Sequence, residues 1–382
     1  QGMVNPQISY GEDVVSRIAY TNDHPDGRKT LQLRLVETLN QMVETMSAEA
    51  GVQAHQIVEA VVVGNTVIHH LFCGLPVEQL GLVPYIPTTN QSLNIPAAQI
   101  GLTLAPGAMI YLPPTIAGYV GADHVAMVLA TDTYLSKNTV ISLDIGTNTE
   151  ITLIHHGEMR CCSCASGPAF EGAHIRDGMR AASGAIERVR IDQDQVVLST
   201  ISGQLPVGIC GSGILDAVSE LVRNKIVDTK GVIRENAPNV QGNGRSREYV
   251  LVPAAKTGHG HDVTLSRQDI NEIQLAKAAI RSGIEILLIE AGIEASQIDH
   301  FIVAGAFGTY LEISSAIKIG MFPDLPLARF DQVGNAAGTG AREMLVSSHK
   351  RQDANELPLH EKYIELTTHA SFQKIFLQSM YF

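Results

Sequence analysis

The feature that most constrains the fold of this chain is a repeat separated by 241 positions. Residues 49–57 read EAGVQAHQI, and residues 290–298 read EAGIEASQI. The segments that follow, VEAVVVGNT (58–66) and DHFIVAGAF (299–307), share an apolar run that ends at a glycine. A repeat at this distance indicates that a whole structural unit is duplicated. We therefore expect two related α/β lobes with a cleft between them, with chance similarity of nine residues as the alternative.

Both copies stand in the same context. Each follows a segment with apolar residues at helical spacing, and each precedes a β-branched run typical of a buried strand. The apolar positions are Leu31, Leu35, Leu39, Met42 and Met46 in the first copy and Ile270, Ile273, Ile280, Ile284 and Leu287 in the second. Ser266 and Asp269 predict the start of the second helix, with Asp where a capping box usually has Glu or Gln.

Composition limits the functions open to the chain. Of 382 residues, 39 are acidic and 27 are basic, which gives a net charge of −12. This charge disfavours binding to nucleic acid or to anionic membranes. No apolar run reaches the roughly 18 residues of a membrane span, and the first residues lack the segments of a signal peptide. Five cysteines without framework spacing indicate a reducing compartment, and we expect the cytoplasm.

Three of these cysteines, Cys161, Cys162 and Cys164, lie close together in RCCSCASGPAF. A metal or cluster site is one interpretation, but no second cysteine pair or Cys/His set accompanies them. Small apolar residues on a strand are the simpler interpretation. We expect core residues here and assign them no metal.

The stretch VISLDIGTNTEITLI (140–154) predicts two strands joined by a tight turn. Gly146, Thr147, Asn148 and Thr149 in the turn can direct backbone N–H groups and hydroxyls at an anion. Asp144, at the strand end, is placed to hold a hydrated Mg²⁺ against that anion. An ordinary hairpin with turn-forming residues is the alternative.

Other glycine turns allow similar interpretations. In VAGAFGTYL (303–311), Gly305, Ala306 and Gly308 would let the backbone approach adenosine, with helix-on-sheet packing as the alternative. Asn65 and Thr66 occupy the equivalent helix start in the first copy. VGICGSGILDAV (207–218) matches neither standard phosphate-loop spacing, so we expect a packing turn. VGNAAGTGAREML (333–345) predicts a small-residue helix in close contact with another helix.

Four motifs follow one another in the order AGYVGADHVAMV, LDIGTNTE, VAGAFGTYL and GNAAGTGAREML. With the duplicated lobes, they resemble the actin, heat-shock-chaperone and sugar-kinase (ASKHA) superfamily of ATPases. The resemblance implies two pseudo-symmetric RNase H-like lobes with an interlobe nucleotide cleft.

More closely, the chain is similar over nearly its whole length to the C-terminal ATPase part of the reductive activators of corrinoid proteins. The matching stretches are NPQISYGEDVVSRI, VVGNTVIHHLFCGLP, PPTIAGYVGAD, LDIGTNTEI, SGPAFEGAHIRDGMRAASGAIE, GICGSGILDAV, DINEIQLAKAAI, AGAFG and VGNAAGTGA. Thr149 stands where that family is expected to have a second glycine.

This resemblance implies ATP and Mg²⁺ as cofactors, a homodimer, and a corrinoid protein of a methyltransferase system as partner. ATP binding or hydrolysis would be coupled to reduction of Co(II) to Co(I). Asp144 would position Mg²⁺ through water, and Lys277 would contact the nucleotide, with a solvated surface lysine as the alternative. Ser163, Ser166 and Glu171 would face the corrinoid partner.

Two expected patterns do not occur in the sequence. The ligand set of a [2Fe–2S] domain, Cys-x4-Cys-x2-Cys and a further Cys, is absent, and no Asp-x-Gly-Thr pattern precedes residue 140. We therefore expect a fragment of a longer chain, with the [2Fe–2S] cluster in a missing N-terminal domain. Within the fragment we expect a first lobe at 1–118, a connecting helix at 119–139, a second lobe at 140–349 and a C-terminal strand and helix at 350–382.

Two other functions are compatible with these motifs. A chaperone-like reactivase of the same superfamily would need the lobes but no iron–sulfur domain. A dimeric nucleotide-binding module would keep the fold without turnover.

Overall fold

The repeat folds into the same succession of elements twice in the computed structural model, which describes residues 2–193 and 195–382. In the first copy, α2 (Gly27–Ala50) is followed by a 3-10 turn and β1 (Glu59–Val61). In the second, α7 (Arg267–Ala291) leads in the same way to β13 (His300–Ala304). The helix–strand order predicted for both copies is confirmed.

The turns after these two helices also share their local structure. The helices end at Gly51 (φ 68°) and Gly292 (φ 67°), in the left-handed region that glycine adopts without steric cost. In the 3-10 turns that follow, the side chain of Gln56 accepts a hydrogen bond of 2.8 Å from the backbone N–H three residues earlier, and Gln297 does the same at 2.9 Å. The sequence similarity therefore reflects a repeated local structure.

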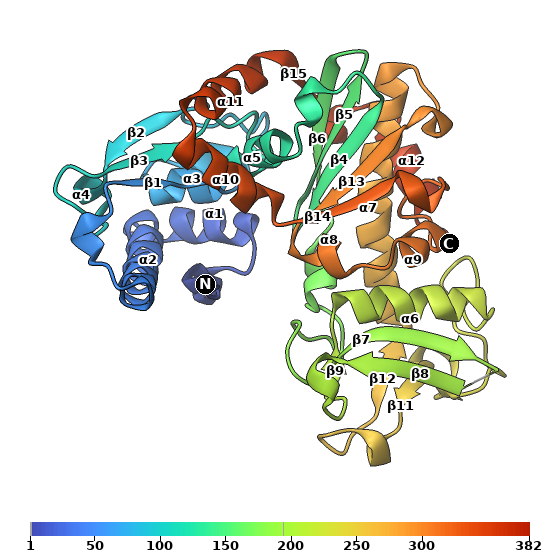
Figure 1. The fold of residues 1–382 in the computed structure, drawn as a ribbon. Coiled ribbons are helices and arrows are strands. Elements are labelled where there is room, and N and C mark those ends of the chain that lie inside the picture. Colours follow the sequence, from blue (N-terminus) through green and yellow to red (C-terminus); the bar gives the residue numbers. More distant parts are fainter. Residues whose placement is uncertain (1, 194) are drawn as a thin grey trace. The chain divides into compact units, whose positions relative to one another are not determined.

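The chain forms two compact units, both drawn in Figure 1. The first comprises residues up to Leu135 together with Asn335–Tyr363, and the second comprises Ser136–Gly334 together with Ile364–Phe382. Each unit thus contains one copy of the repeat. The lobe boundaries at 118, 139 and 349 stay a prediction.

The first unit contains a three-stranded sheet in the order β1-β3-β2, in which β1 is parallel and β2 antiparallel to β3. Helix α10 packs on α5 and on β1. The other elements of this unit are α1 (Val14–Asp23), α3 (Thr66–Phe72), β2 (Leu93–Pro96), α4 (Ala97–Ile100), β3 (Met109–Leu112), α5 (Ala122–Ala130), α10 (Ala336–Val346), α11 (Ser348–His360) and β15 (Glu361–Tyr363).

The two glycines of α10 serve different purposes. Gly340 packs against α5, as predicted for a helix of small residues. Gly338 instead lies in the first turn, where its N–H donates to Oδ1 of Asn335 at 2.8 Å. Only one of the two glycines is therefore required by helix–helix contact.

The second unit is built on five strands in the order β14-β13-β4-β5-β6. Strands β4 (Val140–Ile145), β5 (Thr149–His155) and β6 (Glu158–Cys164) form an antiparallel meander, which confirms the predicted hairpin. Strand β13 runs parallel to β4, and β14 (Phe330–Gly334) runs parallel to β13. Parallel neighbours bring the carboxyl ends of β4 and β13 to the same edge of the sheet.

Helix α7 packs on β5 and β6, and α12 (Phe372–Ser379) packs on α7. Close approach is possible because α7 has a glycine at 283, where a β-carbon would lie 2.4 Å from Sγ of Cys164. Cys161, Cys162 and Cys164 are all buried. Their predicted place in the core is confirmed.

Two small sheets extend the second unit, with strand orders β8-β7-β9 and β10-β11-β12. Helix α6 packs on β7. The bounds of the remaining elements are β7 (Ala185–Asp192), β8 (Gln195–Thr200), β9 (Gly208–Ile209), α6 (Gly211–Arg223), β10 (Val240–Gln241), β11 (Glu248–Val252), β12 (Val263–Ser266), α8 (Ala306–Tyr310) and α9 (Ile313–Lys318).

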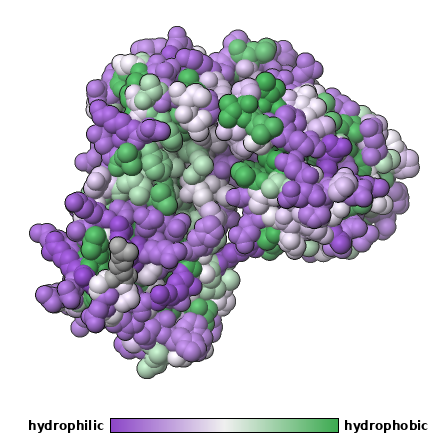
Figure 2. Space-filling model, turned by 180° about the vertical axis from the view of Figure 1, so that it is seen from behind, coloured by the Kyte–Doolittle hydropathy of each residue, from purple (hydrophilic) through white to green (hydrophobic). Residues whose placement is uncertain are grey.

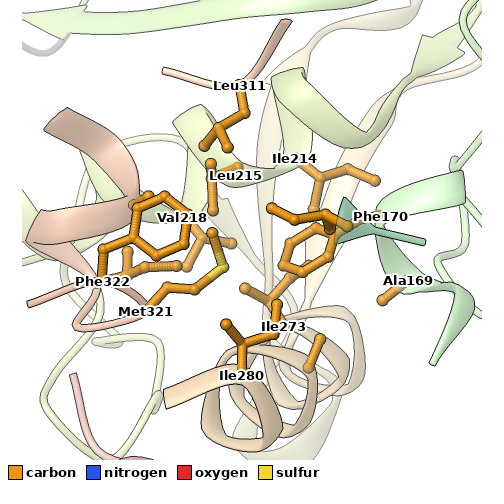
Figure 3. Packing of buried hydrophobic residues seen from close by; sticks show 14 of the residues in the cluster. Ala169, Phe170, Ile214, Leu215, Val218, Ile273, Ile280, Leu311, Met321 and Phe322 are labelled. Atoms are coloured by element: carbon orange, nitrogen blue, oxygen red, sulfur yellow. The ribbon is translucent and has the colours of Figure 1, made fainter. Parts of the chain in front are cut away.

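The core of the second unit forms where α6 and α7 meet. Figure 3 shows Ile214, Leu215 and Val218 of α6 facing Ile273 and Ile280 of α7. Apolar residues from other segments complete this cluster, among them Phe170, Leu311, Met321 and Phe322. Burial of these side chains anchors the loops that carry the candidate site.

Figure 2 shows one face of the protein, on which polar side chains surround separate groups of apolar residues. None of the helices in residues 2–193 and 195–382 is long and apolar enough to cross a membrane.

Candidate functional site

The turn between β4 and β5 presents backbone donors to the surface. Ile145 pairs with Thr149 in the strand register, so Gly146, Thr147 and Asn148 form the turn. Within the described residues, the N–H groups of Thr147 and Asn148 donate to no acceptor. Adjacent free N–H groups in a turn form a concavity for an anion. The arrangement therefore favours the phosphate-binding interpretation of this motif.

The segment after β6 stabilises this turn through hydrogen bonds. Oγ of Ser166 lies 2.8 Å from Oγ1 of Thr149 and donates to the carbonyls of Gly146 (3.2 Å) and Thr147 (3.3 Å). The N–H of Gly167 donates to the carbonyl of Thr147 at 2.9 Å. These bonds hold the carbonyl groups of the turn away from its open side.

Two carboxylates lie side by side at the end of the hairpin. Asp144 on β4 is directly opposite Glu150 on β5, and Ala304 on β13 pairs with Asp144 from the other side. Gly305 follows with φ 91°, and a β-carbon there would lie 2.6 Å from Oδ1 of Asp144. Only glycine fits this position, because any other side chain would displace the Asp144 carboxylate.

A cavity of about 490 Å³ opens within the same unit. Its volume lies in the range of small-molecule and cofactor sites. The residues that line it come from five segments and are Phe170, Glu171, Met179, Arg180, Ala181, Glu187, Ile201, Cys210, Gly211, Ser212, Phe307 and Tyr310. The rings of Phe170 and Phe307 are stacked, with centroids 4.7 Å apart and planes inclined by 14°. The cavity thus has an apolar wall and several charged groups.

Glu171 connects this cavity to the turn. It lines the cavity, and its carboxylate accepts a hydrogen bond from the hydroxyl of Thr147. The turn and the cavity are therefore joined through Glu171 in the second unit.

The GICGSG turn lies at one wall of the cavity. A β-carbon at 211 would lie 1.9 Å from the carbonyl oxygen of Phe170, and one at 213 would lie 2.2 Å from that of Ile186. The predicted packing role of these glycines is confirmed. Gly211 and Ser212 also line the cavity, which the sequence motif did not indicate.

Lys277 is buried, which rules out the solvated surface lysine, and its expected contact with the nucleotide stays a prediction. Its side chain is 1% exposed, its ammonium group donates to the carbonyl of Tyr381, and it lies 5.2 Å from the centre of the Phe382 ring. Burial, with a contribution from Arg281, lowers the pKa of Lys277 to about 8. The residue is neither a solvated surface lysine nor part of the cavity lining.

Asn65 and Thr66 are occupied by local structure in the first unit. Oδ1 of Asn65 caps α3 by accepting from the N–H of Ile68 at 2.9 Å. Thr66 is buried and donates to the carbonyl of Ala117 at 2.7 Å. Oδ1 of Asn65 and the hydroxyl of Thr66 thus serve helix capping and packing, and the expected role of the two residues in nucleotide binding stays a prediction.

The three residues expected to face a partner differ in accessibility. Ser163 lies on β6 and donates to Glu150 at 3.3 Å, and Glu171 is exposed. Ser166 is 4% exposed and its hydroxyl bonds to the turn, so its side chain is not accessible to a partner. Thr149 is buried as well, so its hydroxyl holds the turn and does not face a ligand.

The residues expected to let the backbone approach adenosine, in the segment 303–311, only partly have the surroundings that this role requires. A β-carbon at Gly308 would lie 2.9 Å from Cγ1 of Val303, so this glycine serves packing of helix on strand. Ala306 begins α8, and only its backbone belongs to the described part of the chain. The next residue, Phe307, is the one whose side chain lines the cavity.

Comparison with known families identifies the chain. The family described as the C-terminal domain of RACo, the ASKHA domain, matches residues 138–382, and the family described as the RACo middle region matches residues 1–136. The chain belongs to the RACo family. Similarity covers the whole chain, and the mixed α/β fold and ASKHA class expected from the sequence are confirmed.

Individual RACo relatives show the same similarity. The chain is 32% identical over its full length to the corrinoid activation enzyme RamQ of Eubacterium limosum, covering 65% of that protein. It is 23% identical over 89% of its length to the [Co(II) methylated amine-specific corrinoid protein] reductase of Methanosarcina barkeri, covering 66% of it. The solved structure of a reductive activator for corrinoid, iron-sulfur protein matches the full chain with a TM-score of 0.90 and 36% identity, covering 61% of that structure. The chain spans less than two thirds of the length of these RACo relatives.

An ASKHA domain implies nucleotide binding, and the matched residues 138–382 include nearly all of the second unit together with Asn335–Tyr363 of the first. Within the described residues, no group of three or more His, Cys, Asp or Glu side chains is arranged to hold a metal ion. A Mg²⁺ ion at the Asp144–Glu150 pair would therefore take most of its ligands from phosphate and water, as this ion prefers.

Residues of this site that the motifs did not reveal are Glu150, Phe170, Arg180, Glu187 and Phe307. Glu150 could have been found, because a three-residue turn places it opposite Asp144. The others line a cavity that forms only when β7, α6, α8 and the segment after β6 pack together.

Proposed function

We propose that the second unit binds ATP with its phosphates at the β4–β5 turn and its adenosine in the cavity. The observation that carries this proposal is the continuity of the two through the Thr147–Glu171 hydrogen bond. The free N–H groups of Thr147 and Asn148 supply donors for phosphate, and Arg180 supplies a positive charge at the cavity wall. The stacked rings of Phe170 and Phe307 offer an apolar surface to the base.

We propose that Asp144 positions Mg²⁺ through a bound water, with Glu150 as the second carboxylate. The strand register supports this, since the two acids lie directly opposite each other. A cation between them would relieve the repulsion of like charges across the strands. Bound Mg²⁺ would neutralise phosphate charge, and the chain's own part is to orient the two carboxylates.

We further propose that the longer protein containing this chain activates a corrinoid protein by reducing Co(II) to Co(I). The names and similarity of the RACo relatives support this function. A reduced [2Fe–2S] cluster, which we place outside the described residues, would supply the electron for this reduction. ATP is coupled to the step because this reduction is very unfavourable for a ferredoxin-like donor.

The coupling is a shift between conformations. A nucleotide that binds one arrangement of the two lobes more tightly increases its population, and that arrangement binds the corrinoid protein with a different affinity. We propose a homodimer as part of this device. The free state of all five cysteines fits a cytoplasmic location.

The test uses the longer protein with a chemical reductant, ATP and the corrinoid proteins encoded near its gene. Formation of Co(I) is followed by absorbance, with and without ATP. We expect Co(I) to accumulate with one of these partners only when ATP is present. If no partner yields ATP-dependent Co(I), the proposed activation is wrong.

A further inference from the structure

The negatively charged side chain of Glu171 lies beside the proposed position of the nucleotide phosphates, which are also negatively charged. Its carboxylate accepts the hydrogen bond of the Thr147 hydroxyl in the middle of the β4–β5 turn. Glu171 is exposed and lines the cavity, so it borders both the proposed phosphate and adenosine positions. A phosphate group that used the Thr147 hydroxyl would have to displace this carboxylate or share the hydroxyl with it.

The backbone that carries Glu171 is firmly anchored. The residue ends a short 3-10 helix, Pro168–Glu171, whose Phe170 is only 5% exposed and packs in the core. Gly172 follows with φ 84°, and a β-carbon there would lie 2.6 Å from the backbone N of Met179. The backbone at Glu171 is therefore fixed. A loop movement could not take the carboxylate away from the turn without disrupting the core.

The charges around Glu171 do not cancel it. Arg180 lines the same cavity, but within the described residues Glu171 forms no ion pair with a lysine or arginine. A phosphate chain bound at the turn would thus face an uncompensated negative charge. Near a protein surface, repulsion between neighbouring charges of this kind changes binding by about tenfold or more.

We propose that Glu171 is a specificity-determining residue that discriminates against nucleotide without a bound divalent cation. Mg²⁺ lowers the negative charge of the phosphates, and water in its coordination shell can donate hydrogen bonds to the carboxylate. The Mg²⁺ complex is therefore accepted, and the free nucleotide is repelled. This inference rests on the proposed nucleotide site and adds the chemical form of the nucleotide that the site selects.

The test measures binding of a fluorescent ATP analogue to the 382-residue chain, once with Mg²⁺ and once with EDTA. Glu171→Gln keeps the size of the side chain and its bond to Thr147 but removes the charge. We expect this variant to bind the metal-free nucleotide about tenfold more tightly than the unmodified chain, with a change below about threefold for the Mg²⁺ complex. Glu158→Gln, at the opposite end of β6, is the matched control and should change neither value.

The possible results separate this inference from the proposed function. If Glu171→Gln leaves metal-free binding unchanged, Glu171 does not select the Mg²⁺ complex, although the nucleotide site stands. If the unmodified chain binds the nucleotide neither with Mg²⁺ nor with EDTA, the proposed site itself is wrong. A second variant, Glu171→Ala, should reproduce the gain in metal-free binding, since the charge and not the amide group is responsible.

Discussion

Gly340 on α10 lies directly against the backbone of Ala126 on α5: a β-carbon at 340 would be 2.0 Å from the Ala126 carbonyl oxygen. Because that oxygen belongs to a helix backbone, it cannot move aside as a side chain would. The distance between the two helices in the first unit is thus set by the absence of a side chain at this position.

We predict that Gly340→Ala lowers the free energy of unfolding by about 1–3 kcal/mol, the usual cost of overpacking. The loss should appear although alanine favours a helix by about 1 kcal/mol over glycine. Urea unfolding measures the effect. Gly338→Ala is the control, since the three atoms nearest to a β-carbon there belong to the side chain of Asn335 and not to a helix backbone. Equal effects of the two variants would contradict the close contact.

We predict that the buried hydroxyl of Ser166 stabilises the β4–β5 turn. Ser166→Ala removes the bonds to Thr149, Gly146 and Thr147, so we expect a loss of about 1–3 kcal/mol in stability, together with weaker nucleotide binding. Ser163→Ala is the matched control, because its hydroxyl makes one long bond to Glu150. Thermal unfolding and nucleotide titration of both variants provide the measurement. A larger effect at Ser163 would overturn this assignment.

We predict that the titration of Lys277 changes the free energy of unfolding at alkaline pH. Burial lowers the pKa of Lys277 from its usual value of 10.5 to about 8 in the folded protein. Between these values the unfolded chain holds a proton that the folded chain has lost, so the stability contribution of this group rises with pH. The full difference amounts to about 3 kcal/mol at most.

Urea unfolding between pH 7.5 and 10.5 tests this dependence in three proteins. Relative to the unmodified chain, Lys277→Met should lose the rise in stability with pH. Lys318→Met, an exposed lysine of the same unit, should retain it. Parallel pH profiles for all three proteins would show that Lys277 does not titrate as its environment indicates.

The sequence predicted the repeated elements well because local signals specify them. The capping box at Ser266 and the glycines after α2 and α7 act through neighbouring residues, so no tertiary information is needed. Lys277 could have been placed correctly by the same reasoning. It lies four residues after Ile273 and three before Ile280, on the buried face of α7.

The cavity could not be predicted in this way. Phe170, Arg180, Glu187 and Phe307 belong to segments that meet only through the packing of α6 and α8 against the sheets. Turn residues posed a different problem, since a motif does not tell which hydroxyl faces outward. Thr147 faces the open side and Thr149 the interior because of the strand register at Ile145.

Asp144 and the β4–β5 turn together are proposed to bind the Mg²⁺ complex of ATP. Isothermal titration of the 382-residue chain with ATP and Mg²⁺ tests this proposal most directly, with Asp144→Asn as the variant and the exposed Asp324→Asn as the control. We predict binding at one site in the unmodified chain and in the control, and a loss of affinity of about tenfold or more in Asp144→Asn. Equal affinity of Asp144→Asn and the unmodified chain, or no binding by either, would contradict the claim.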